Sequence, residues 1–192
     1  MRGAAATRRN AAARRESLAA DLRTHVRGEV QFGAGDRALY ATDSSNYRQL
    51  PIGVVRPLDT DDLVETIRAC HDHDAPITLR GGGTSLAGQA TNTAVVIDVS
   101  RHLNRIAELD PERRVARVQP GVVLDDLRSA AEAHHLTFGP DPATHDRCTL
   151  GGMLGNDSCG AHSIMAGRTS DNVESLDVLT YDGLRLRISR SR

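Results

Sequence analysis

The sequence predicts an α+β fold in which a small parallel β-α-β sheet is followed by a mainly antiparallel sheet. Two apolar runs, residues 52–55 and 77–79, flank an amphipathic segment of helical period. Further along the chain, turn signals at 110–112 and 181–183 each separate two strand-like runs, the pattern of a hairpin. At 192 residues, the chain is long enough for one well-buried domain or two small ones.

The chain before the first strand is expected to hold one helix. Residues 16–27 carry apolar side chains at four-residue spacing, and Gly28 suits the helix end. The arginine-rich arm that precedes them is either a disordered lead-in or the first turn of this helix. Residues 31–49 are polar and rich in turn formers, so we expect irregular surface chain there.

The β-α-β unit follows. Acidic and hydroxyl residues at 59–62 suit the first turn of a helix, which we expect to run to about His73. Because a helix connects the strands at 52–55 and 77–79, parallel pairing is favoured. Residues 94–99 form a third strand that is apolar on both faces, as an interior strand is.

Two hairpins are predicted in the rest of the chain. One joins 103–109 to 114–119, and the other joins 173–180 to 184–188 across an Asp-Gly turn. Between them, 122–134 has the pattern of a helix with an acidic start. The last hairpin leaves little chain for further pairing, so we expect the second subdomain to be incomplete. The predicted division is a lead-in at 1–49 and a domain at 50–192, with subdomains at 50–119 and 120–192.

Composition excludes several classes of function. The net charge of −1, the absence of Trp and an aromatic content of 3% give no case for nucleic-acid binding. No apolar run approaches the ~18 residues that span a bilayer. The three cysteines have neither a metal-ligand spacing nor an even count, so we predict no metal and reduced, buried thiols. A cytoplasmic location is expected, with peripheral membrane association as the alternative.

A run of glycines directly after the strand at 77–79 is the first candidate binding site. Gly81, Gly82 and Gly83 are followed by two hydroxyl residues, Thr84 and Ser85. Glycine lets backbone N–H groups approach a ligand closely, and successive N–H groups in such a turn form a concavity that suits phosphate. The alternative is a plain surface turn. Because no helical pattern follows the glycines, a Rossmann-type dinucleotide site is disfavoured.

A second glycine-rich stretch begins at Thr149. Its hydroxyl can cap a short helix whose free N–H groups would face an anion, while neighbouring glycines allow close approach. Upstream, Gly121 makes a tight turn from strand into helix. The other candidate residues of the stretch are Gly151, Gly152, Asn156, Ser158 and Gly160.

Together these motifs resemble the FAD-binding domain of the vanillyl-alcohol-oxidase type, also called PCMH-type. They are most similar to the N-terminal part of the FAD-linked D-2-hydroxyacid dehydrogenases that act on D-lactate, glycolate or D-2-hydroxyglutarate. Residues 80–85 resemble the first pyrophosphate loop of that family. Residues 140–144, 149–152 and 156–160 resemble its second flavin-binding stretch, and 167–173 resembles the segment near adenine and ribitol. The resemblance thus implies these cofactor-binding residues: Arg80, Gly81, Gly82, Gly83, Thr84, Ser85, Gly121, Pro140, Asp141, Thr144, Thr149, Gly151, Gly152, Asn156, Ser158, Gly160 and Val173.

The resemblance also implies a flavin-dependent oxidoreductase that transfers a hydride from a D-2-hydroxyacid to FAD. Thr84 stands where some relatives carry a flavin-linking His, so the FAD is expected to be non-covalent. A protein or a quinone would accept the electrons, and an iron–sulfur cluster is expected only in chain downstream of this sequence. Catalytic groups are likewise expected outside the chain, His145 and His162 being the imidazoles considered within it. The alternatives are a stand-alone flavin-binding module and a truncated fragment without activity of its own.

Overall fold

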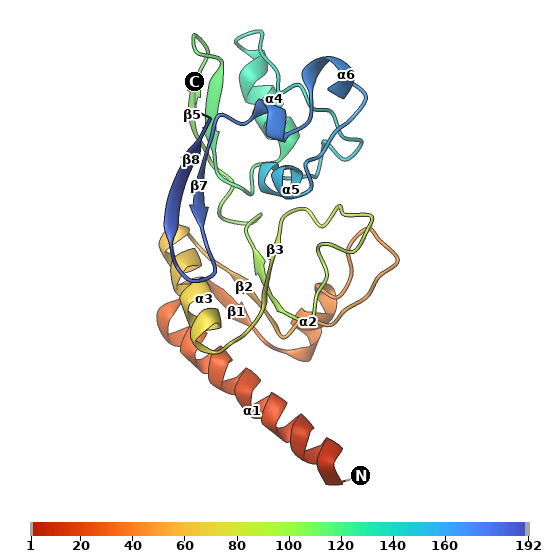
Figure 1. Cartoon of the computed structure of the whole chain (residues 1–192), viewed down its shortest axis with the longest axis vertical. Coiled ribbons are helices and arrows are strands. Elements are labelled where there is room, and N and C mark those ends of the chain that lie inside the picture. Colours follow the sequence, from red (N-terminus) through yellow and green to blue (C-terminus); the bar gives the residue numbers. More distant parts are fainter. Residues whose placement is uncertain (1, 191–192) are drawn as a thin grey trace. The chain divides into compact units, whose positions relative to one another are not determined.

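The computed structural model describes residues 2–190, with side chains from residue 10 onward. The chain forms two compact units, each built from several segments (Figure 1). Unit 1 contains residues 2–79, 85–98 and 180–184, and unit 2 contains 80–84, 99–179 and 185–190. Residues 99–119 therefore fall in unit 2, whereas the sequence-based division assigns them to the first subdomain. That division stays a prediction.

A four-stranded sheet forms the centre of unit 1. Its strands are β1 (Glu29–Gln31), β2 (Gly53–Arg56), β3 (Ile77–Arg80) and β4 (Val95–Asp98), in the order β1-β2-β4-β3. Strand β4 pairs in parallel with β2, and β1 is antiparallel to β2. The predicted crossover from β2 to β3 is present within one sheet, but the two strands are not neighbours because β4 lies between them.

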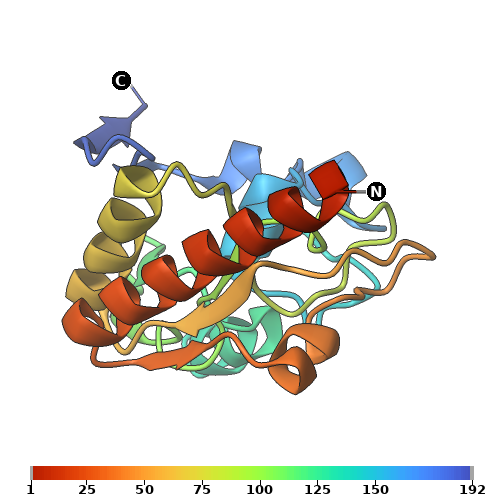
Figure 2. The same cartoon turned by 90° about the horizontal axis from the view of Figure 1, so that it is seen from below.

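The helices of unit 1 are α1 (Arg2–His25), α2 (Ala34–Leu39) and α3 (Thr60–Asp72). Asp59 caps α3 by accepting a hydrogen bond from the backbone N–H of Asp62 at 3.0 Å, as the acidic start predicts. Helices α1 and α3 lie side by side (Figures 1 and 2), and a contact of 3.1 Å joins His73 Nε2 to Asp21 Oδ2.

Helix α1 includes the arginine-rich arm, so the helical one of the two alternatives for that arm is confirmed. The expectation of irregular chain over 31–49 is wrong at 34–39, where α2 forms after Gly33 in extended conformation. A two-turn helix that contains a glycine and buries none of its residues gives no periodic signal, and this explains why the sequence pattern misses it.

The core of unit 1 centres on β4. All four of its residues are buried, which confirms the prediction of an interior strand. From the neighbouring elements, α1 contributes Leu18 and Leu22, and β2 contributes Val54 and Val55. The glycine loop begins at residue 81, directly after β3.

Unit 2 contains two hairpins and three short helices. The hairpins are β5 (Ile106–Asp110) with β6 (Val115–Val118) and β7 (Ser175–Leu179) with β8 (Arg185–Ser189), both antiparallel as predicted. The helices are α4 (Leu124–Glu132), α5 (Leu150–Gly155) and α6 (Ser163–Ala166), with a single 3₁₀ turn, η1, at Ser170–Asn172. Val122, Leu124, Leu127, Cys148, Leu150 and Met153 form its core. No helix among the described residues has the length and apolarity needed to cross a membrane.

Candidate functional site

The glycine loop after β3 packs directly against the start of α5. A Cβ atom added to Gly81 would collide with the side chain of Thr149, and one added to Gly82 would collide with the backbone carbonyl of Arg147. Gly83 has φ +65°, a conformation that side-chain-bearing residues rarely adopt, and its missing Cβ would lie 2.5 Å from Arg80 Nη2. The two glycine-rich stretches predicted from the sequence are therefore brought together within unit 2.

The same loop presents unused backbone donors. Within the described part of the chain, no group accepts a hydrogen bond from the N–H of Gly81, Gly82 or Thr84. Gly82 is exposed, and no helix or strand includes residues 81–84. Adjacent N–H groups of this kind form a concavity with a positive electrostatic potential. The loop can thus receive an anionic group of a ligand.

Helix α5 has the predicted cap but lacks the predicted free donors. The Thr149 hydroxyl accepts a hydrogen bond from the Gly152 N–H at 3.3 Å, which confirms the cap. However, the Leu150 N–H donates to the Val122 carbonyl at 2.8 Å, and the Gly151 N–H donates to the Pro120 carbonyl at 2.8 Å. The prediction that these N–H groups face an anion is therefore wrong.

The cause is a short antiparallel pairing that the sequence pattern does not reveal. Residues 120–124 run beside residues 148–151, with an isolated bridge between Val123 and Thr149. Gly121 is buried in this arrangement and donates its N–H to the Leu103 carbonyl at 2.7 Å. Because an added Cβ would meet the carbonyls of Val99 and Leu103, Gly121 allows its backbone to pack closely on these two residues.

Residues 140–144, in the loop before α5, are held by ionic side chains. Asp141 Oδ1 lies 3.1 Å from Arg128 Nη1, and its Oδ2 lies 3.0 Å from His162 Nδ1. The backbone around Thr144 turns tightly, since the Thr144 carbonyl accepts from the Cys148 N–H at 2.8 Å. Both carboxylate oxygens of Asp141 are therefore engaged by side chains of the protein.

The two imidazoles considered for catalysis each pair with a carboxylate. His145 Nδ1 lies 2.7 Å from Asp125 Oδ2, and His162 contacts Asp141 as described above. The His162 side chain is 70% exposed and that of His145 is 46% exposed. Such surface pairs hold loops in place, and neither geometry singles out a general base.

The end of the second stretch packs against residues 167–173. The Ser158 carbonyl accepts from both the N–H (3.0 Å) and the hydroxyl (2.8 Å) of the buried Thr169. Asp157 accepts from the Ser170 N–H at 3.0 Å and pairs with Arg168 at 3.0 Å. Hydrogen bonds from Ser170, and then the Arg168 charge, hold the pKa of the Asp157 carboxyl below its usual value. Residues 157–158 and 168–170 are thus joined by hydrogen bonds and an ion pair.

The remaining predicted residues lie in four places. The Asn156 side chain is exposed and donates to the Gly152 carbonyl at 3.0 Å. Gly160 packs so closely on the Asp141 carbonyl that no Cβ would fit. Val173 is half-buried directly after η1. Ser85 belongs to unit 1, where its hydroxyl accepts from the Gln89 N–H at 3.2 Å and closes a turn of its own loop.

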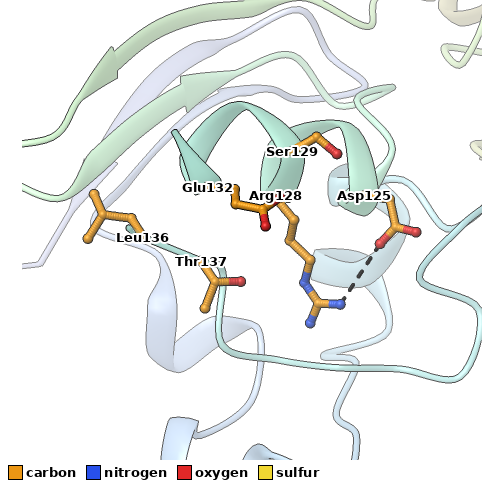
Figure 3. Close-up of a pocket in the computed structure, with 6 residues that line it drawn as sticks. All are labelled: Asp125, Arg128, Ser129, Glu132, Leu136 and Thr137. Atoms are coloured by element: carbon orange, nitrogen blue, oxygen red, sulfur yellow. Dashed lines mark ion pairs between the residues drawn. The ribbon is translucent and has the colours of Figure 1, made fainter. Parts of the chain in front are cut away.

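A hollow of about 300 Å³ lies beside α4 and contains none of the predicted cofactor residues (Figure 3). Asp125 and Arg128 point into it from the helix, and Leu136 and Thr137 line its other side. Arg128 is the site-related residue that the sequence analysis missed. Its only signal is an Asp-x-x-Arg spacing on a polar helix face, which is common to many surface helices.

Comparisons with known proteins show the family of the chain. Residues 51–189 match the model of the family described as FAD binding domain. D-2-hydroxyglutarate dehydrogenase of Pseudomonas putida is 38% identical over 174 residues, which cover 89% of this chain and 17% of that protein. The glycolate oxidase subunit GlcD of Bacillus subtilis is 34% identical over 149 residues, which cover 77% of this chain and 32% of that subunit.

A solved structure with a similar fold is 6-hydroxy-D-nicotine oxidase from Arthrobacter nicotinovorans, with a TM-score of 0.74 and 27% identity. The match covers 85% of this chain and 36% of that one. The α+β fold is thereby confirmed, and the chain spans about a third of that protein's length or less in each comparison.

Proposed function

Because the chain belongs to the FAD binding domain family over residues 51–189, we propose that it binds FAD non-covalently as the cofactor-binding part of a D-2-hydroxyacid dehydrogenase. The family implies the cofactor. The substrate class is supported by similarity to D-2-hydroxyglutarate dehydrogenase and to a glycolate oxidase subunit. The match covers 17% of the first protein and 32% of the second.

The observation that carries the proposal is the set of unused donors in the glycine loop. The N–H groups of Gly81, Gly82 and Thr84 have no acceptor among the described residues and suit the pyrophosphate of FAD. Since the N–H groups at the start of α5 are all engaged by the protein, the loop and not the helix would receive the phosphate charge. Thr149 and Arg147, at and before the start of α5, pack directly against the loop.

Thr84 supports the non-covalent mode. It follows the glycines directly, where a flavin-linking residue would stand, and a threonine hydroxyl is a poor nucleophile without an adjacent base. Bound FAD would accept a hydride equivalent from the substrate α-carbon. His145 and His162 would hold loops through their carboxylate partners, so the groups that bind the hydroxyacid and take its proton would come from outside these residues.

A second possibility is a flavin-binding module that acts only with a partner chain. The similarity to a protein whose name marks it as a subunit favours it. In that case a protein or quinone acceptor and the substrate site would both depend on the partner. FAD binding by this chain is common to both possibilities.

Titration of the purified chain with FAD tests the proposal, with flavin fluorescence and the visible spectrum after gel filtration as readouts. We expect saturable binding of FAD and weaker binding of FMN, which lacks the pyrophosphate. Acid precipitation should release all flavin into the supernatant. Absence of FAD retention at any concentration would overturn the proposal, and flavin that stays with the precipitate would overturn the non-covalent mode. Turnover of D-2-hydroxyglutarate, glycolate or D-lactate with a dye acceptor separates an active enzyme from a dependent module.

A further inference from the structure

The segment at residues 140–144 has no secondary structure of its own. It belongs to a loop that runs from 133 to 149 between α4 and α5. Local turns supply part of its order, since the His145 N–H donates to the Pro142 carbonyl at 3.0 Å and the Arg147 N–H donates to the Thr144 carbonyl at 2.9 Å. A loop without a hydrogen-bonded ladder keeps one conformation only when other groups satisfy and fix its backbone.

Arg128 on α4 supplies most of those fixing contacts. Its Nη2 donates to the Pro140 carbonyl at 3.0 Å and its Nη1 to Asp141 Oδ1 at 3.1 Å. Both Nε and Nη2 reach the Phe138 carbonyl at 3.4 Å. The side chain is only 22% exposed. A planar guanidinium with five donors can bind three acceptors at fixed angles, whereas a lysine ammonium cannot match that fork.

Two neighbouring ion pairs complete the arrangement. Asp125 lies one turn before Arg128 on the same side of α4 (Figure 3), 3.9 Å from its guanidinium, and binds His145 just beyond Thr144. On the other side, His162 binds the second oxygen of Asp141. The segment is thus fixed at its beginning by Arg128 and at its end by Asp125, both from one helix.

We infer that Arg128 is a positioning residue for FAD. Before FAD binds, Arg128 holds residues 140–144 in the conformation that the cofactor requires. The inference rests on the proposed function, because it assigns the segment to the flavin. Preordering of this kind raises affinity, since less conformational entropy is lost on binding. Arg128 itself makes no contact with FAD in this account.

Hydrogen exchange and FAD titration of the full chain test the inference. The variants are Arg128→Ala and Arg128→Lys, and the charge-matched control is Arg113→Ala in the exposed turn of the β5–β6 hairpin. Without FAD, we expect exchange of the amides at 137–148 to rise at least about tenfold in both Arg128 variants, and exchange in β5 and β6 to stay unchanged. FAD affinity should fall about tenfold or more, and the control should match the wild type.

A free guanidinium compound at non-denaturing concentration should restore part of the affinity of Arg128→Ala but not of Arg128→Lys, whose side chain fills the site. Unchanged exchange at 137–148 overturns the inference, as does raised exchange with undiminished FAD affinity. If the wild-type chain binds no FAD, the proposed function fails together with the cofactor role of Arg128. The exchange measurement then still decides whether Arg128 orders the segment.

Discussion

Gly81 lies directly against the side chain of Thr149, with no room for a methyl group between them. Gly81 belongs to the loop that follows β3, and Thr149 is the N-cap residue of α5. Their contact fixes the distance between two glycine-rich stretches that are far apart in sequence. Among the described residues, the loop N–H groups of Gly81, Gly82 and Thr84 stay free, whereas those at the start of α5 are engaged by residues 120–122.

Gly82→Ala should weaken FAD binding. The added methyl would meet the Arg147 carbonyl, so the loop and its N–H groups would have to move. We expect at least about a tenfold loss of affinity, or ~1.4 kcal/mol, by fluorescence titration. Gly35→Ala is the control, because an added Cβ there meets nothing within 4 Å. Equal affinity in the two variants would show that the loop does not bind the cofactor.

Thr149→Val should destabilise the chain, because it keeps the shape of the side chain but removes the cap of α5. Loss of a cap costs about 1 kcal/mol in the free energy of unfolding, which urea denaturation measures. Thr149→Ser retains the hydroxyl and should recover most of that stability. Thr137→Val, at an exposed loop position, should leave the midpoint unchanged. A Val variant as stable as the wild type would mean that the 3.3 Å contact carries no energy.

Local chemistry predicted most elements of this fold, and non-local pairing accounts for the failures. The Thr149 cap, the Asp59 cap and the Asp-Gly turn with Gly183 at φ +87° all depend on neighbours in sequence. The engagement of the α5 donors depends on residues 120–122, which lie some thirty positions earlier. No sequence pattern within α5 indicates that pairing. The position of β4 between β2 and β3 likewise has no local sequence signal.

The candidate site shows the same difference between features set by local sequence and features set by non-local contacts. Glycine spacing identified both stretches, because the need for close backbone approach is visible in residue type. Arg128 escaped notice, since an arginine on a polar helix face is typical of solvent-exposed helices. Its role depends on where the 137–148 loop folds back. Cys159 also differs from expectation, because it is exposed whereas Cys70 and Cys148 are buried.

Acid should destabilise the chain partly through Asp62. Burial works to raise the pKa of this carboxyl, but hydrogen bonds from the Leu58 and Arg27 N–H groups and the Arg27 side chain outweigh it, and the pKa lies below 3.8. A lowered pKa contributes stability that is fully present above the ordinary value and is lost as pH falls through the folded-state value.

Asp62→Asn should therefore be less stable than the wild type at pH 7 and should lose less stability between pH 5 and pH 2, as urea denaturation at each pH would show. Asp61→Asn, exposed on the same turn, is the control. Parallel pH profiles for wild type and Asp62→Asn would contradict the assignment.

Alkylation should distinguish the three thiols. Burial raises the pKa of Cys70 to about 12 and also raises that of Cys148, and neither side chain is accessible. Because the thiolate is the reactive form, iodoacetamide at pH 8 should label Cys159 alone in the folded chain and all three thiols in urea. Peptide mass spectrometry identifies which cysteines are alkylated. Rapid native labelling of Cys70 would indicate that unit 1 opens locally.

The position of β4 also has a consequence for biosynthesis. Since β4 separates β2 from β3, these two earlier strands cannot join one sheet until residues 95–98 have left the ribosome. Until then, β2 and β3 have no strand between them, and the buried side chains of β4 are missing from the core. Because the central strand of this sheet is synthesised last, the sheet folds through long-range contacts. A pause in translation before residue 95 would therefore prolong the exposure of the apolar strands to chaperones.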